Sequence, residues 1–195
     1  MTLFVTLFAS WGCGLIAGIL LGFSNFVMPA LARLPAAEGV RAMQSINVAV
    51  LNRWFLGALL GTALLCAGLA LSSLARWSEP GAARQLAGSC SYLIGTILVT
   101  KLYHVPRNTA LARLPADSEA AEGFWPRYVA EWTTWNHVRG AAALAAAALL
   151  TLALLASSGC NRPLRPIAAP GSVTPVARSS VSAWVASLQA QTREP

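Results

Sequence analysis

The chain has 195 residues, of which 56% are hydrophobic and only 11% are charged. Average soluble domains carry about 25% charged residues, so this composition excludes an ordinary soluble domain and indicates an integral membrane protein. The net charge of +7 is explained by apposition to anionic lipid and requires no nucleic-acid partner. One domain is expected for this length, and four membrane helices would use nearly all of it.

Four apolar stretches each come close to the ~20 residues that a helix needs to cross the hydrocarbon layer. Helices are required there, because backbone groups in lipid must pair within their own segment. The sequence therefore predicts an all-α fold, an integral membrane four-helix transmembrane bundle with helical caps on one face. The predicted spans are residues 3–23, 54–75, 86–103 and 137–157.

The bundle is predicted to form one domain of residues 1–158, followed by a flexible tail of residues 159–195. The tail is rich in proline and serine, a composition that cannot bury a core. Within the tail, Val181, Trp184 and Leu188 fit a short interfacial helix and disordered chain equally well.

The helical caps are predicted from two long connections, residues 24–53 and 104–136, which lie on the same side of the membrane. In the first connection, apolar residues that include Val40 and Met43 predict a short amphipathic helix lying over the end of the bundle. In the second, an aromatic pattern predicts a helix that starts near Pro126 and continues into the fourth span.

Small residues predict where the helices approach each other closely. On the third span, Gly88, Ser91 and Gly95 mark one face. Without bulky side chains, this face allows the backbone of a neighbouring helix to come near.

Polar side chains gather at the capped ends of the spans, where imidazole and guanidinium groups are costly unless they are paired or functional. Thr96, Thr100 and His104 share one face of the third span, and Asn136 and Arg139 share a face beside His137 at the start of the fourth. A polar site and a structural polar plug both fit this pattern. If it is a site, the candidate catalytic residues are His104, Asn136, His137 and Arg139.

The sequence shows no pattern that is typical of a metal or cofactor site. The four cysteines show no CxxC or other metal-like spacing, and neither histidine has a second ligand at helical spacing. No acidic residue lies inside a span, which disfavours a carboxylate proton relay. We therefore expect no metal and no cofactor.

Four segments of the chain stand out as motifs: residues 23–31 (FSNFVMPAL), 46–52 (INVAVLN), 105–108 (VPRN) and 132–139 (WTTWNHVR). They resemble the signatures of a family of four-helix membrane proteins that includes the fungal anthrone oxygenases. The resemblance covers about residues 5–158, although the family pattern has asparagine where this chain has His104 and Thr109.

The resemblance implies oxygenation of an activated C–H bond in a flat aromatic or polyketide-like, anthrone-type molecule without a bound cofactor. His137, or His104 in its place, would remove the proton, since an imidazole has an ordinary pKa near neutrality. Arg139, Asn136 and Asn25 would stabilise the oxyanion. The implied substrate-binding residues are Asn25, Asn47, Asn52 and Asn108, with Tyr103 and Trp135 stacking on the ring.

The competing interpretation is a non-enzymatic membrane protein, such as an accessory subunit or a small-molecule carrier, whose amides only tie the caps to the helix ends. A pocket lined by Asn25, Asn136, His137 and Arg139 would favour an enzyme or a binder over this alternative. An Ala-, Gly- and Arg-rich composition with a single lysine predicts the cytoplasmic membrane of a bacterium. A slight excess of arginines places the capped face in the cytoplasm.

Overall fold

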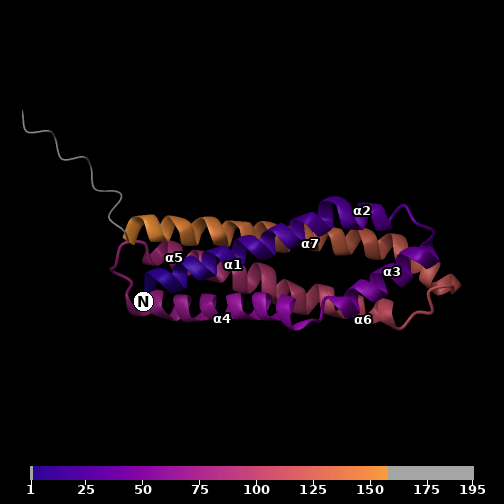
Figure 1. Cartoon of the computed structure of the whole chain (residues 1–195), viewed down its shortest axis with the longest axis horizontal. Coiled ribbons are helices and arrows are strands. Elements are labelled where there is room, and N and C mark those ends of the chain that lie inside the picture. Colours follow the sequence, from indigo (N-terminus) through magenta and orange to yellow (C-terminus); the bar gives the residue numbers. More distant parts are fainter. Residues whose placement is uncertain (1, 158–195) are drawn as a thin grey trace, which may run out of the picture. The chain divides into compact units, whose positions relative to one another are not determined.

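The computed structural model of the protein describes residues 2–157, and the predicted tail lies outside the described residues. Every regular element within 2–157 is helical, and four continuous helices are long and apolar enough to cross a membrane. The predicted all-α four-helix membrane fold is therefore confirmed (Figure 1). The long helices are Leu3–Leu31, Arg53–Ala75, Ala82–Ala112 and Glu119–Ser157.

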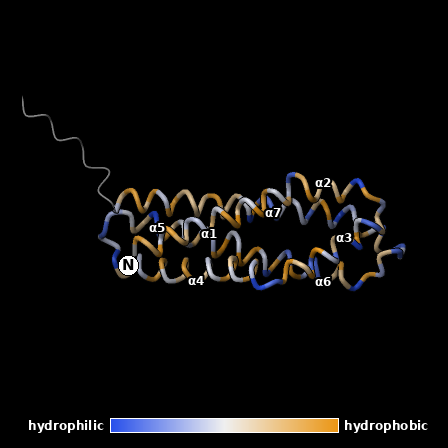
Figure 2. Tube along the Cα trace, in the orientation of Figure 1, coloured by the Kyte–Doolittle hydropathy of each residue, from blue (hydrophilic) through white to orange (hydrophobic). Residues whose placement is uncertain are grey.

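Within these helices, short π-helical turns separate α-helical parts. The elements are α1 (Thr2–Gly22), η1 (Phe23–Val27), α2 (Met28–Leu31), α3 (Ala36–Ala49), α4 (Arg53–Ala75), α5 (Ala82–Cys90), η2 (Ser91–Leu98), η3 (Thr100–His104), α6 (Val105–Ala112) and α7 (Glu119–Ser157). Figure 2 shows that hydrophilic residues concentrate at the connections and that the helices are mostly apolar.

The membrane core forms where α1, α4, α5 and α7 run side by side (Figure 1). Ile16, Cys66, Tyr92 and Leu150 from these helices and η2 are buried together. Gly95 lies so close to Ala142 of α7 that a methyl group at position 95 would overlap it. The Ser91 hydroxyl donates to the Ala142 carbonyl at 2.9 Å. The predicted close approach on the face of Gly88, Ser91 and Gly95 is thus confirmed.

A second core lies at the end of the bundle where α2, α3 and α6 meet the first half of α7 (Figure 1). The predicted amphipathic helix is α3, and its Val40 and Met43 are fully buried. The residues of this outer core include Met28, Leu31, Val40, Met43, Leu111, Trp125, Tyr128 and Trp132.

The largest differences from the predicted spans lie at three helix ends. The first helix continues to Leu31 instead of ending near residue 23, and the third continues to Ala112 instead of residue 103. The fourth begins at Glu119, so Pro126 lies inside it and not in its first turn. These extensions carry side chains of the outer core, so tertiary burial stabilises turns that hydropathy alone does not predict.

A cavity between the two cores as candidate functional site

A cavity of about 510 Å³ lies between the membrane core and the outer core. Its wall is mostly apolar, with Phe23, Met43, Phe55 and Leu59 among the lining residues. A volume of this size suits a small organic molecule, and a few polar groups in an apolar wall are typical of ligand sites. The polar lining residues are Gln44, Asn47, Thr96, Thr100, His104, Asn108, Thr109 and Arg139.

Arg139 supplies a buried positive charge to this wall. Its side chain donates from Nη1 to Thr100 Oγ1 at 3.0 Å and from Nη2 to Asn136 Oδ1, and its Nε makes no hydrogen bond. The residue is only 7% exposed, and no carboxylate of the described chain forms an ion pair with it. A buried charge without a counter-ion is costly, so this position favours an anionic or partly anionic ligand group.

Asn136 forms a hydrogen bond with the Arg139 guanidinium but does not itself line the cavity. Its amide Nδ2 donates to the Leu20 carbonyl at 2.6 Å and to Ser24 Oγ at 2.7 Å, which joins α7 to α1 and η1. Its Oδ1 accepts from Arg139. Asn136 therefore fixes the guanidinium through hydrogen bonds to two elements.

His104 lies on the cavity wall and is only 2% exposed. Neither ring nitrogen makes a hydrogen bond, although the carbonyls of Val99 and Trp132 lie close to the ring. A general base must reach the proton it removes, and this imidazole is the one that faces the cavity. Within residues 2–157, no three His, Cys, Asp or Glu side chains are grouped to hold a metal ion.

Trp132 lies between His104 and Arg139 and was not predicted as a site residue. Its ring meets the His104 ring edge-on with the centroids 5.1 Å apart, and Arg139 Cζ lies 5.5 Å from its centroid. Asn108 Oδ1 accepts from Trp132 Nε1 at 3.1 Å and from the Tyr128 hydroxyl at 2.9 Å. Asn108 thus fixes the indole that contacts both functional side chains.

The sequence does contain a signal for Trp132. Trp132, Asn136 and Arg139 are spaced four and three residues apart, so one face of α7 carries all three. The same spacing turns His137 away from that face, and His137 is exposed.

Several predicted site residues lie away from the cavity. His137 and Asn25 are exposed, and Asn52 caps α4 by accepting from the backbone N–H groups of Trp54 and Phe55 at 3.0 Å. Tyr103 and Trp135 stack on each other with centroids 3.7 Å apart, and neither lines the cavity. The expected pocket of Asn25, Asn136, His137 and Arg139 is therefore not formed, since only Arg139 of the four reaches the cavity.

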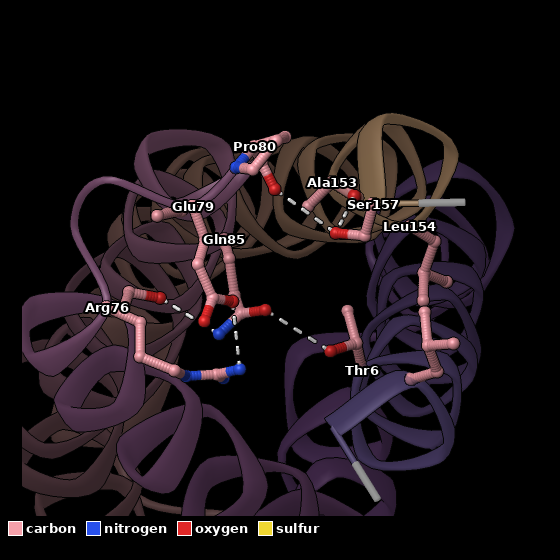
Figure 3. A pocket seen from close by; sticks show the side chains of 11 residues that line it. Thr6, Arg76, Glu79, Pro80, Gln85, Ala153, Leu154 and Ser157 are labelled. Carbon is pink, nitrogen blue, oxygen red and sulfur yellow. Dashed lines mark hydrogen bonds and ion pairs between the residues drawn. The ribbon is translucent and has the colours of Figure 1, made fainter. Parts of the chain in front are cut away.

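A smaller pocket of about 200 Å³ lies near the turn between α4 and α5 (Figure 3). Gln85 Nε2 donates there to Ser73 Oγ at 2.9 Å and to the Leu69 carbonyl at 3.1 Å. Arg76 Nη1 pairs with Glu79 Oε2 at 3.1 Å. Each of these polar groups has a hydrogen-bonding or ionic partner. The pocket is therefore a place where polar side chains connect α4 and α5.

Comparison with known families gives a match. The family model described as anthrone oxygenase matches residues 50–149, just over half of the chain. The match includes His104, Asn108, Trp132 and Arg139 but not residues 23–31. No curated protein and no solved structure matches. The chain belongs to the anthrone oxygenase family, which suggests an oxygenase-type role.

Proposed function

We propose that this protein is a membrane-embedded, cofactor-independent oxygenase that acts on a flat aromatic or polyketide-like molecule of the anthrone type. The observation that carries the proposal is Arg139, a buried cation without a counter-ion on the wall of an apolar cavity that His104 shares. A substrate that becomes an enolate during the reaction would supply the missing negative charge.

The reaction starts with proton transfer. His104 removes a proton from a CH2 group that an aromatic ketone activates, and the charge of the resulting enolate moves to the ketone oxygen. Arg139 stabilises this oxygen from a position that Thr100 and Asn136 fix before substrate binds. Such preorganised donors act strongly where water is excluded.

Oxygen transfer then needs no external reductant. The enolate carbon bonds to one atom of O2, the peroxide takes up a proton, and loss of water leaves a new C=O group. In sum, one CH2 group and one O2 give one C=O group and one H2O. The carbon supplies all the electrons, so the chemistry is balanced without a cofactor.

Asn47 offers a second polar contact at the α3 side of the cavity. Its Nδ2 is buried without a hydrogen bond and lies near the Tyr128 hydroxyl. A carbonyl or phenolic oxygen of the substrate would accept from this amide. Asn47 of α3 and Arg139 of α7 would then both contact the bound ring.

Oxygen uptake with anthrone tests the proposal. In lipid nanodiscs, the wild type should consume oxygen above the rate of anthrone autoxidation. Arg139→Met should reduce the rate by about 10²–10³-fold, and His104→Gln by about 10²–10⁴-fold. His137→Gln is the matched control and should leave the rate unchanged, because His137 is exposed. Binding of anthrone without any oxygen uptake would instead support a small-molecule carrier.

We further propose that the protein lies in the cytoplasmic membrane of a bacterium, with the lipid bilayer as its partner and no nucleic-acid partner. The end that carries α2, α3 and α6 would face the cytoplasm, where positively charged connections are favoured. Labelling of Arg113→Cys with a charged maleimide tests this orientation. The residue is exposed and should react in inverted vesicles but not in intact spheroplasts.

A further inference from the structure

The cavity reaches the outer surface of the bundle through an apolar rim. Val48 is 74% exposed and Leu51 is 67% exposed, and both line the cavity. Among the described lining residues only Arg139 carries a full charge, and it is buried. Apolar exposure of this kind is typical of a surface that meets lipid or an apolar partner. The rim consists of the exposed lining residues, all of them apolar except Thr109: Ile19, Val48, Leu51, Leu60, Val105, Thr109 and Ala112.

The rim begins at the depth of the membrane interface. Trp54 is exposed at the start of α4, and Arg53 Cζ lies 5.2 Å from the centroid of its ring. Tryptophan and arginine at a helix end are typical of the interface. Leu60 lies about 9 Å further along α4 at a rise of 1.5 Å per residue. The rim therefore extends from the interface into the apolar layer.

The outer end of the cavity is closed by α3. Gln44 Nε2 donates to the carbonyls of Leu111 and Leu114, each at 2.9 Å. Arg41 pairs with Asp117 at 3.6 Å, and the fully buried Met43 lines the cavity on this side. These contacts hold α3 against α6 and the connection to α7. On this side the lining residues Met43 and Gln44 are buried or half-buried, whereas the lining residues of the rim are exposed.

We infer that the ligand reaches this cavity from within the bilayer, through a lateral opening between the α3–α4 connection and α6. The inference rests on the proposed function and narrows its substrate class. The substrate is an uncharged, lipophilic, flat molecule that dissolves in the membrane near the interface. It acquires negative charge only beside Arg139, after its proton has left. A charged, water-soluble substrate does not fit this route.

Narrowing the rim tests the route. The double variant Leu51→Trp with Val105→Trp places bulk on both sides of the opening, and Leu64→Trp with Leu71→Trp is the matched control on the exposed face of α4. The probe is anthraquinone dissolved in phosphatidylcholine nanodiscs. Its association and dissociation are followed by quenching of tryptophan fluorescence, and Trp132→Phe identifies the part of the signal that arises in the cavity.

The narrowed rim should slow association and dissociation alike, each about ten-fold, which corresponds to ~1.4 kcal/mol of added barrier. The dissociation constant should not change, because a barrier on the route affects both directions equally. Leu51→Ala with Val105→Ala should accelerate both rates, which keeps the test decisive if the tryptophan variant folds poorly. The control pair should behave like the wild type.

Unchanged rates in both rim variants would overturn the lateral route while leaving the proposed function intact. If the association and dissociation rates of anthraquinone change as expected but the wild type does not oxidise anthrone, the lateral route is supported. The enzymatic proposal is then refuted. Absence of anthraquinone binding to the wild type would refute both.

Discussion

Asn108 is a shared acceptor for two aromatic donors, and its effect on the site passes through Trp132. The Trp132 and Tyr128 side chains both donate to its Oδ1, and Trp132 in turn contacts His104 and Arg139. We therefore regard Asn108 as a positioning residue. An aspartate preserves an acceptor at this point, whereas a leucine does not.

Asn108→Leu should lower the free energy of unfolding by about 1–3 kcal/mol, because buried donors lose their acceptor. Since the Trp132 indole is then free to move, kcat for anthrone should fall more than KM rises. Asn108→Asp should restore much of the loss in both properties. Chemical denaturation and steady-state oxygen uptake measure the two effects. Equal behaviour of the leucine and aspartate variants would show that the acceptor has no positioning role.

The site could be predicted in part from residue types. Arg139 and Asn136 were found because a guanidinium and an amide share a helix face near the membrane. The sequence favours His137 over His104 because the resembled family has asparagine at position 104. His137 nevertheless points about 100° away from Asn136, as adjacent residues on a helix do. His104 and Trp132 belong to different helices. Their contact therefore could not be predicted from the residue spacing within either helix.

At the scale of the helices, spans were predictable because apolar length is a local property, whereas helix ends depend on what they pack against. Ser118 Oγ accepts the Ala121 N–H at the start of α7, and Glu119 and Glu122 occupy its first turn. This cap is a recognisable start signal that outweighs Pro126. The extension of the first helix to Leu31 had no comparable signal.

Close packing of the third long helix on α7 gives a prediction for Gly95. A methyl group there would overlap Ala142, whose Cβ moves only with its backbone, so Gly95→Ala should lower the free energy of unfolding by about 1–3 kcal/mol. Gly61→Ala is the matched control, because a methyl group at position 61 meets nothing within 4 Å. It should be neutral or slightly stabilising, since alanine favours a helix over glycine. Thermal unfolding in detergent compares the two, and a stable Gly95→Ala variant would contradict the packing.

Across residues 2–157, the two cores meet around a cavity, and this arrangement ties stability to ligand binding. The outer core holds Trp132 and Met43 on one side of the cavity, and the membrane core holds Leu20 and Leu59 on the other. Because an empty cavity forfeits packing contacts that a ligand restores, the two cores should unfold less readily when the cavity is filled.

Anthraquinone, a stable flat ring ketone, should therefore stabilise the folded protein. At 100 times its dissociation constant, a ligand that binds only the folded state adds about 2.7 kcal/mol. Leu56→Trp fills the cavity with a side chain from α4, so it should abolish the increase in unfolding temperature, while the exposed control Leu64→Trp should retain it. If the ligand raised the unfolding temperature of both variants equally, it would bind outside the cavity, and the two cores would not be linked through it.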